Sequence, residues 1–127
     1  MDATALNIEM CKKAKELQNS WERKHGDYYY DTSVGGVNLY HSTYFIYPHK
    51  NKDIWLPTQD QLQEIAFEYL SKKTISSYYT IFSLIFDFSE FAKQTYGFDS
   101  MDQLWLIFVM KEKFGKIWNG KDWIVEK

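Results

Sequence analysis

Near the C-terminal end of the chain, residues 100–110 read Ser100-Met101-Asp102-Gln103-Leu104-Trp105-Leu106-Ile107-Phe108-Val109-Met110. Ser100 with Gln103 three residues later is typical of a helix start, because the two side chains satisfy backbone groups that the first turn leaves unpaired. The middle of this segment is apolar on every side of such a helix, and Gly115 stands where the helix is expected to end. A helix without a polar face must be enclosed by other elements, so this segment predicts the most buried helix of the fold.

Two further helices are predicted between Pro57 and this segment. Thr58 and Gln61 form a capping box, and a helical apolar series follows them. That series consists of Leu62, Ile65, Ala66, Tyr69 and Leu70. Residues 77–96 predict a second helix, because most of their apolar side chains share one broad face that we assign to the core. The residues assigned to this face are Tyr78, Ile81, Phe82, Leu84, Ile85, Phe88, Phe91, Ala92 and Tyr96.

The N-terminal part predicts a helix followed by strands. Leu6, Met10, Ala14, Leu17 and Trp21 recur at helical spacing, which predicts one amphipathic helix from about Thr4 to Trp21. The residues from Asp27 to Tyr47 are of β type on both sides of Gly35-Gly36, which predicts two strands joined through the glycine pair. Ile54-Trp55-Leu56 predicts a third short strand, which Pro57 ends.

Asn119-Gly120, between two apolar flanks, is the preferred two-residue turn of a β-hairpin, because both positions tolerate positive φ. We therefore expect an α+β fold with an N-terminal helix, a small and mainly antiparallel sheet, three further helices and a C-terminal β-hairpin as a candidate addition to that sheet. The length of 127 residues fits a single globular domain spanning residues 1–127.

Charge and hydropathy exclude several classes of protein. The 15 basic and 17 acidic side chains are spread evenly, and neither half of the chain has an excess of positive charge, which argues against broad binding of nucleic acid or anionic membrane. The longest apolar run, Leu104 to Met110, is far shorter than the ~20 residues of a spanning helix. Cys11 is the single cysteine, so we interpret it as a buried thiol. We expect a cytoplasmic protein with no secretory signal.

Side chains that could act in catalysis or bind a metal ion are present, but they lack the spacing in the sequence that such sites need. His25, His41 and His49 do not show the short repeats that place metal ligands on one element. The acidic residues at Asp60 and Asp102 belong to helix starts, where a carboxylate is favoured by the helix dipole. No nucleophile elbow, phosphate-binding loop or dinucleotide fingerprint occurs. We therefore expect no catalytic residue, no metal site and no cofactor, and the chain is not predicted to be an enzyme.

Aromatic side chains make up 19% of the residues, with 10 tyrosines. Most fall on helical stripes, but Tyr28, Tyr30, Tyr40 and Tyr44 lie in the predicted sheet, where burial explains them least, and we predict a binding surface there. Such tyrosines suit a protein interface, or a stacking platform for single-stranded nucleic acid. A stacking platform also needs a basic groove, so the charge distribution favours a protein partner or self-association.

Three segments carry a resemblance to a known group of proteins. They are Trp55-Leu56-Pro57-Thr58-Gln59-Asp60-Gln61-Leu62, Ser100-Met101-Asp102-Gln103-Leu104-Trp105-Leu106 and Trp118-Asn119-Gly120-Lys121-Asp122-Trp123. In this order they resemble small proteins encoded by bacteriophages and prophages of Gram-positive bacteria. That group has no established activity, so the resemblance implies a viral setting in a host cell and assigns no catalytic residue.

The sequence thus predicts a non-catalytic protein-interaction or assembly module of phage or prophage origin. The alternative is an accessory protein that binds single-stranded nucleic acid through the tyrosine-rich sheet.

Overall fold

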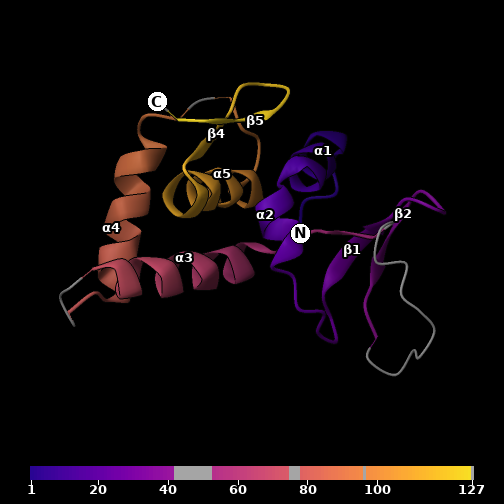
Figure 1. The fold of residues 1–127 in the computed structure, drawn as a ribbon, viewed down its shortest axis with the longest axis horizontal. Helices are drawn as coiled ribbons and strands as arrows, with labels where there is room; N and C mark the ends of the chain where they lie inside the picture. Colours follow the sequence, from indigo (N-terminus) through magenta and orange to yellow (C-terminus); the bar gives the residue numbers. More distant parts are fainter. Residues whose placement is uncertain (42–52, 75–77, 96, 127) are drawn as a thin grey trace. The chain divides into compact units, whose positions relative to one another are not determined.

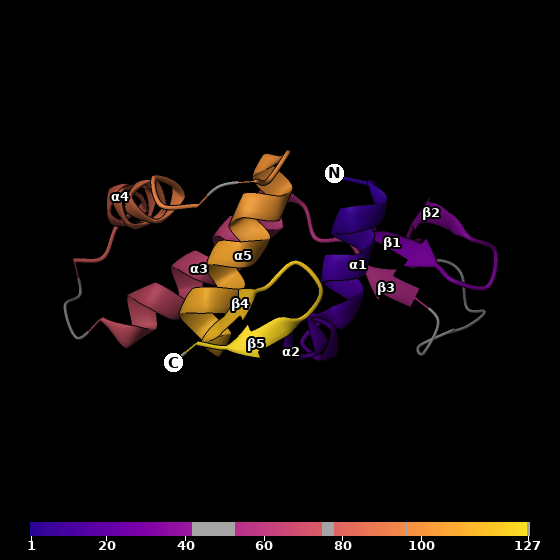
Figure 2. The same cartoon turned by 90° about the horizontal axis from the view of Figure 1, so that it is seen from above.

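The computed structural model describes residues 1–41, 53–74, 78–95 and 97–126. Helices and two small antiparallel sheets make up the described part, which confirms the α+β class (Figures 1 and 2). The chain divides into two compact units, Met1–Thr58 and Gln59–Lys127, and each is described by itself. The expectation of one domain over the whole length stays a prediction.

The first unit begins with two short helices, α1 (Ala5–Lys13) and α2 (Lys15–Asn19), in place of the single helix predicted from Thr4 to Trp21. The continuous helix was therefore wrong: Ala14 lies between them with a ψ of 71°, outside helical geometry. The Cys11 carbonyl near this break accepts a hydrogen bond from the Gln18 side chain, 3.0 Å from nitrogen to oxygen. A side chain thus satisfies a backbone group near the break.

The sheet of the first unit contains three antiparallel strands in the order β2-β1-β3. These are β1 (Tyr28–Asp31), β2 (Gly36–Leu39) and β3 (Asp53–Trp55). The two strands predicted around the glycine pair are confirmed, and so is the third short strand. Gly35 is needed in their turn, because its φ of 73° lies in the left-handed region that other residues rarely adopt. Residues 42–47 of the second predicted strand lie outside the described residues.

Gln18 joins α2 to the outer edge of the sheet. Because β3 is an edge strand, the backbone groups of Trp55 that point away from β1 have no strand to pair with. The Gln18 amide meets both of them: its Oε1 accepts from the Trp55 N–H at 2.8 Å, and its Nε2 donates to the Trp55 carbonyl at 3.0 Å. One side-chain amide therefore acts as the peptide group of a missing neighbouring strand.

The second unit is built around one buried helix. Its elements are α3 (Gln59–Lys73), α4 (Ile81–Ala92), α5 (Met101–Phe114), β4 (Lys116–Trp118) and β5 (Trp123–Val125). In Figure 1, α5 lies between α3 and the β4–β5 hairpin, with α4 beside it. All residues from Trp105 to Met110 are buried, which confirms the prediction of the most enclosed helix.

The ends of α5 also follow the predicted chemistry. The Ser100 hydroxyl accepts from the Gln103 N–H at 3.2 Å, and Gly115 closes the helix with a φ of 65°. On α3, the predicted apolar series is confirmed at Leu62, Ala66 and Leu70, which are buried, whereas Ile65 and Tyr69 are half-buried.

The terminal hairpin is confirmed, but its turn differs from the prediction. Trp118 pairs with Trp123, so the loop runs from Asn119 to Asp122 instead of being a two-residue Asn-Gly turn. The physical reason is the Asn119 side chain, whose Oδ1 accepts from the backbone N–H groups of Lys121 and Asp122 at 2.9 and 2.7 Å. This side chain stabilises a wider loop. The two strands form a sheet of their own and do not extend the sheet of the first unit.

We predict that Gln18→Ala destabilises the protein by about 1–3 kcal/mol, because it removes both hydrogen bonds to Trp55 and leaves those backbone groups unpaired. Urea unfolding followed by tryptophan fluorescence measures the change, and amide hydrogen exchange at Trp55 should accelerate. The matched control is Asn19→Ala, which removes an exposed amide from the same short helix. Equal unfolding midpoints for the two variants would contradict the role of Gln18.

Candidate functional surfaces

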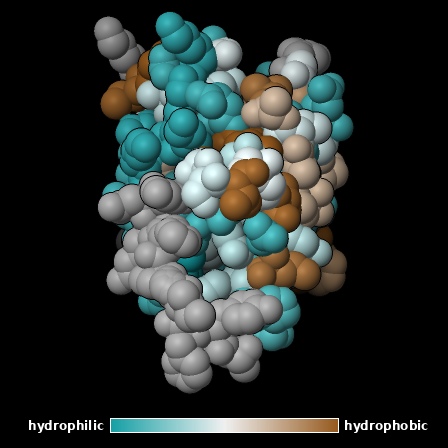
Figure 3. Space-filling model, turned by 90° about the vertical axis from the view of Figure 1, so that its right-hand side faces the viewer, coloured by the Kyte–Doolittle hydropathy of each residue, from teal (hydrophilic) through white to brown (hydrophobic). Residues whose placement is uncertain are grey.

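The predicted tyrosine surface is formed in part. Tyr28 and Tyr30 lie on the same face of β1, opposite Leu39 and Val37 of β2. Both tyrosines are half-buried, as is Tyr40, which follows β2 and is bonded through its backbone to Gly26 and Asp27. Tyr44 lies outside the described residues. Figure 3, seen from the side of β1 and β2, shows apolar patches broken up by hydrophilic ones.

Charges near these tyrosines are engaged in structural contacts. Arg23, the only arginine of the chain, pairs with the Asp53 carboxylate at 2.7 Å, and its guanidinium lies 4.2 Å from the centre of the Trp21 ring. The Trp21 indole N–H donates to the buried Asp27 carboxylate at 2.9 Å. This cluster connects the chain after α2 to the sheet. The Arg23 guanidinium, which could otherwise bind a phosphate group of a nucleic acid, is already engaged in it.

The histidines are brought together in part. The rings of His25 and His41 meet edge to face, with 5.1 Å between their centroids, and His49 lies outside the described residues. Within the described ranges, no three His, Cys, Asp or Glu side chains gather closely enough to hold a metal ion. Their sequence spacing gave no sign of the contact between His25 and His41, because it depends on how the end of β2 meets the turn before β1.

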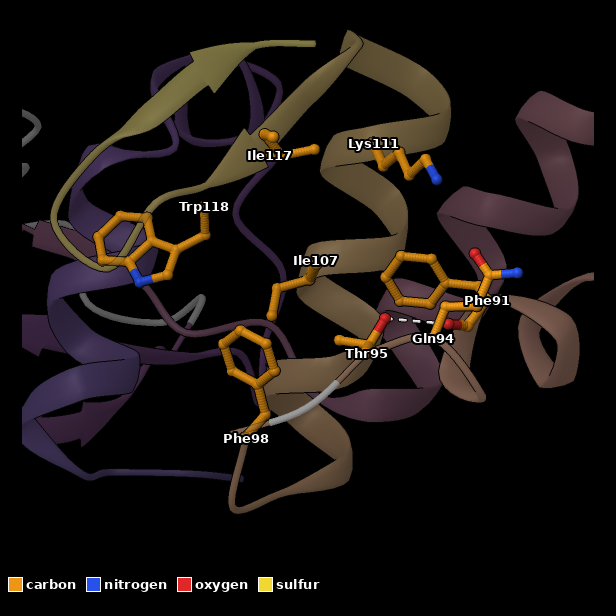
Figure 4. Close-up of a pocket in the computed structure, with 8 residues that line it drawn as sticks. All are labelled: Phe91, Gln94, Thr95, Phe98, Ile107, Lys111, Ile117 and Trp118. Carbon is orange, nitrogen blue, oxygen red and sulfur yellow. Dashed lines mark hydrogen bonds between the residues drawn. The ribbon is translucent and has the colours of Figure 1, made fainter.

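A cavity of about 260 Å³ opens on the second unit, where the end of α4 meets α5 and β4 (Figure 4). Its lining residues are Phe91, Gln94, Thr95, Phe98, Ile107, Lys111, Ile117 and Trp118. Aromatic rings form much of the wall, and the Lys111 ammonium lies 5.6 Å from the centre of the Phe91 ring and 3.8 Å from the Glu126 carboxylate. The lining combines aromatic and aliphatic side chains with the polar ends of Gln94, Thr95 and Lys111, and it contains no carboxylate or thiol.

The largest departure from the predictions concerns α4. Leu84 and Phe88 are buried as expected, but the assignment of Tyr78, Ile81, Phe82 and Ile85 to the core was wrong. Ile81, Phe82, Ile85 and Phe86 of α4 and Tyr78, which precedes the helix, are all exposed, and we call these five residues the α4 face. The exposed fractions are 82% for Tyr78, 51% for Ile81, 78% for Phe82, 52% for Ile85 and 65% for Phe86.

The reason lies in the width of the apolar arc on α4. Phe88 stacks parallel on Trp105 of α5 with 3.8 Å between ring centroids, and it meets Phe108 edge to face at 5.5 Å. These contacts turn the side with Leu84 and Phe88 toward α5. Phe82 and Phe86 then project from the other side of the helix, and Ile81 and Ile85 lie at the margin of the buried stripe, where they stay about half exposed.

Several local contacts hold α4 in this orientation. The Thr80 hydroxyl accepts from the Ser83 N–H, and the Ser83 hydroxyl accepts from the Thr80 N–H, which completes a capping box. The Tyr79 hydroxyl donates to the Asp87 carboxylate at 2.8 Å, and the Tyr79 ring lies 5.9 Å from the Phe67 ring of α3. The α4 face is therefore carried by a helix that is anchored at its first turn and along its buried side.

The α4 face carries no charge. No Asp, Glu, Lys or Arg occurs from Tyr78 to Phe86. Asp87 is bonded to Tyr79, and Glu90 forms an ion pair with Lys93 at 2.9 Å near the C-terminal end of the helix. A partner on the α4 face would thus desolvate apolar surface almost exclusively.

Comparison with known proteins gave no relatives: no protein-family model matches the chain, and no curated protein or solved structure was found to be similar. In the part of the chain that the structure describes, no helix combines the length and the apolar character needed to cross a bilayer.

We predict that Tyr79→Phe lowers the free energy of unfolding by about 1–2 kcal/mol at neutral pH, because it removes the hydrogen bond to the Asp87 carboxylate. Burial, and then the bond to Asp87, raise the pKa of Tyr79. A raised pKa in the folded state means that this stabilisation is complete below the unfolded value of about 10 and is lost as the pH rises above it.

Unfolding in urea at several pH values checks this prediction. The wild-type protein should lose stability above about pH 10 more steeply than Tyr79→Phe does. Tyr69→Phe, which removes a hydroxyl from α3, serves as the control and should follow the wild type. Parallel pH profiles for the wild type and Tyr79→Phe would contradict the proposed contact.

Proposed function

We propose that this chain is a non-catalytic protein-interaction or assembly module of phage or prophage origin, that it acts in the host cytoplasm, and that it binds its partner through the α4 face. The observation that carries the proposal is the exposure of Phe82 and Phe86 on a helix whose other side is firmly packed, with the exposed Tyr78 shortly before the helix begins. The sequence resemblance described above supports the viral setting.

The size of the α4 face supports a role in binding. A fully exposed aromatic side chain offers about 150–250 Å² of surface, so the three rings of the α4 face, together with its two half-exposed isoleucines, expose on the order of 700 Å². The largest apolar patch on a typical monomer is about 300–600 Å² and is often functional. Aromatic side chains are also the residues that dominate the energy of protein interfaces.

The structure also supports this face over the tyrosine surface that the sequence favoured. Tyr28, Tyr30 and Tyr40 are half-buried, whereas Phe82 and Tyr78 are about four-fifths exposed. A half-buried tyrosine contributes less new apolar burial on binding than a fully exposed ring does. Tyr28, Tyr30 and Tyr40 therefore remain secondary candidates for a binding role.

The proposal is tested by affinity capture from cells that express the chain, with quantitative identification of the proteins retained. We expect the wild-type chain to retain a defined protein partner, which can be a second, differently tagged copy of the chain. The double variant Phe82→Glu/Phe86→Glu should retain at least about 90% less of this partner, because it replaces two central aromatic side chains by charges.

The matched control is Val34→Glu, which places the same charge on an apolar side chain that is 72% exposed in the first unit. Val34→Glu should retain the partner as the wild type does. Circular dichroism should show both variants folded, because the substituted side chains make few buried contacts. Equal retention by the wild type and the double variant would overturn the α4 face as the binding surface.

A further inference from the structure

We propose that the partner of the α4 face is a second copy of this chain, and that two α4 helices pack against each other around a two-fold axis. This inference rests on the proposed function and deepens it by naming the partner. It is argued from the area of the face, the absence of charge on it and the order of its side chains along the helix.

The area fits a dimer of this kind. A standard protein interface buries about 800 Å² on each partner, and the α4 face alone exposes on the order of 700 Å². In a two-fold dimer both partners bring the same patch, so one such face on each copy provides nearly the whole interface. A partner of another kind would need its own apolar surface of similar size.

The α4 face is compatible with itself because it carries no charge. A two-fold interface places each residue opposite a residue of the same surface, so any charge near the axis would meet an identical charge. Since no charged residue occurs from Tyr78 to Phe86, this repulsion does not arise.

The order of side chains along α4 suits antiparallel packing. With the axis at Phe82, the Phe82 rings of the two copies meet, and Ile81, Ile85 and Phe86 of each copy lie beside them. Tyr78 precedes the helix and adds exposed aromatic surface near its N-terminal end. Residues three and four apart form a continuous stripe on a helix, as such packing requires.

Glu90 does not oppose this arrangement. It is exposed beyond the apolar stripe, about two turns from Phe82, and forms an ion pair with Lys93 of the same chain. With the axis at Phe82, Glu90 falls opposite position 74, before the first residue of the partner's α4, so the two Glu90 side chains lie far from each other.

The test uses the purified full-length protein and sedimentation velocity over a concentration series up to the order of 100 µM. We expect a dimer for the wild type. Phe82→Glu and Phe82→Lys should each weaken dimerisation at least about 30-fold, as expected for a central aromatic side chain of an interface. Val34→Glu is the control and should dimerise as the wild type does, since Val34 lies outside the α4 face.

Mixing the two variants tests the antiparallel arrangement directly. If Phe82 lies opposite the partner's Phe82, then Phe82→Glu and Phe82→Lys are each repelled by their own kind and attracted by the other. An equimolar mixture should therefore form a mixed dimer although each variant alone is monomeric. Recovery on mixing supports the arrangement, and failure to recover overturns it.

Two other outcomes overturn the dimer. One is a wild-type protein that stays monomeric over the whole concentration range, and the other is a Phe82→Glu variant that dimerises as the wild type does. The capture experiment then decides about the function separately. If the wild-type chain retains a protein other than itself and Phe82→Glu/Phe86→Glu does not, the proposed function stands with a different partner. If the wild type and the double variant retain the same proteins equally, both proposals are overturned.

Discussion

The parallel stack of Phe88 on Trp105, with 3.8 Å between ring centroids, determines which side of α4 faces the interior of the second unit. Phe108 meets both rings edge to face, at 5.5 Å from Phe88 and 5.6 Å from Trp105. This aromatic cluster lies where α4 crosses the most buried helix, and such ring arrangements gain energy beyond the area that they bury. Because a helix is rigid, fixing one of its sides also fixes the other. The exposed position of Phe82 and Phe86 is thus a direct consequence of the Phe88–Trp105 contact.

The first unit depends on a different interaction: polar side chains form hydrogen bonds with backbone groups that have no backbone partner. Gln18 satisfies the outer backbone groups of Trp55, and the Asp27 carboxylate accepts from the Lys24 N–H at 2.9 Å as well as from Trp21. A small sheet cannot bury enough apolar surface to tolerate unpaired polar groups at its edge. Short helices and short strands are therefore held together by side chains that act like pieces of main chain.

The sequence predicted the elements whose signals are local and independent of their neighbours. Ser100, the apolar run and Gly115 defined α5, because caps and burial on all sides leave one interpretation. The β-hairpin was also predicted, but its loop was not, because the Asn119 side chain replaces a backbone acceptor that the two-residue turn would have used. The break at Ala14 left no signal, since Met10, Ala14 and Leu17 keep helical spacing and are all buried across it.

The candidate site was missed for a related reason. Periodicity shows that α4 is a helix with a broad apolar arc, but it does not show which part of that arc meets a neighbour. Nine apolar positions were assigned to one buried face. Tyr96 lies outside the described residues, and of the others Leu84 and Phe88 are buried whereas Tyr78, Ile81, Phe82 and Ile85 are exposed. The useful signal was the width of the arc itself, because an arc wider than one contact surface predicts a second contact surface.

The two sides of α4 differ in what they contribute to folding, and the proposed binding uses the side that contributes least. Phe88 and Phe82 are the same residue type less than two turns apart, but Phe88 is 8% exposed and Phe82 is 78% exposed. Truncation of a buried phenylalanine leaves a cavity and typically costs about 3–5 kcal/mol, whereas surface substitutions usually stay within about 0.5 kcal/mol. The large exposed rings on α4 therefore contribute little to the stability of the second unit. A large exposed apolar surface typically marks an interaction site, so these rings motivate the proposed binding, and the charge-free stretch from Tyr78 to Phe86 matches the apolar partner that the proposal names.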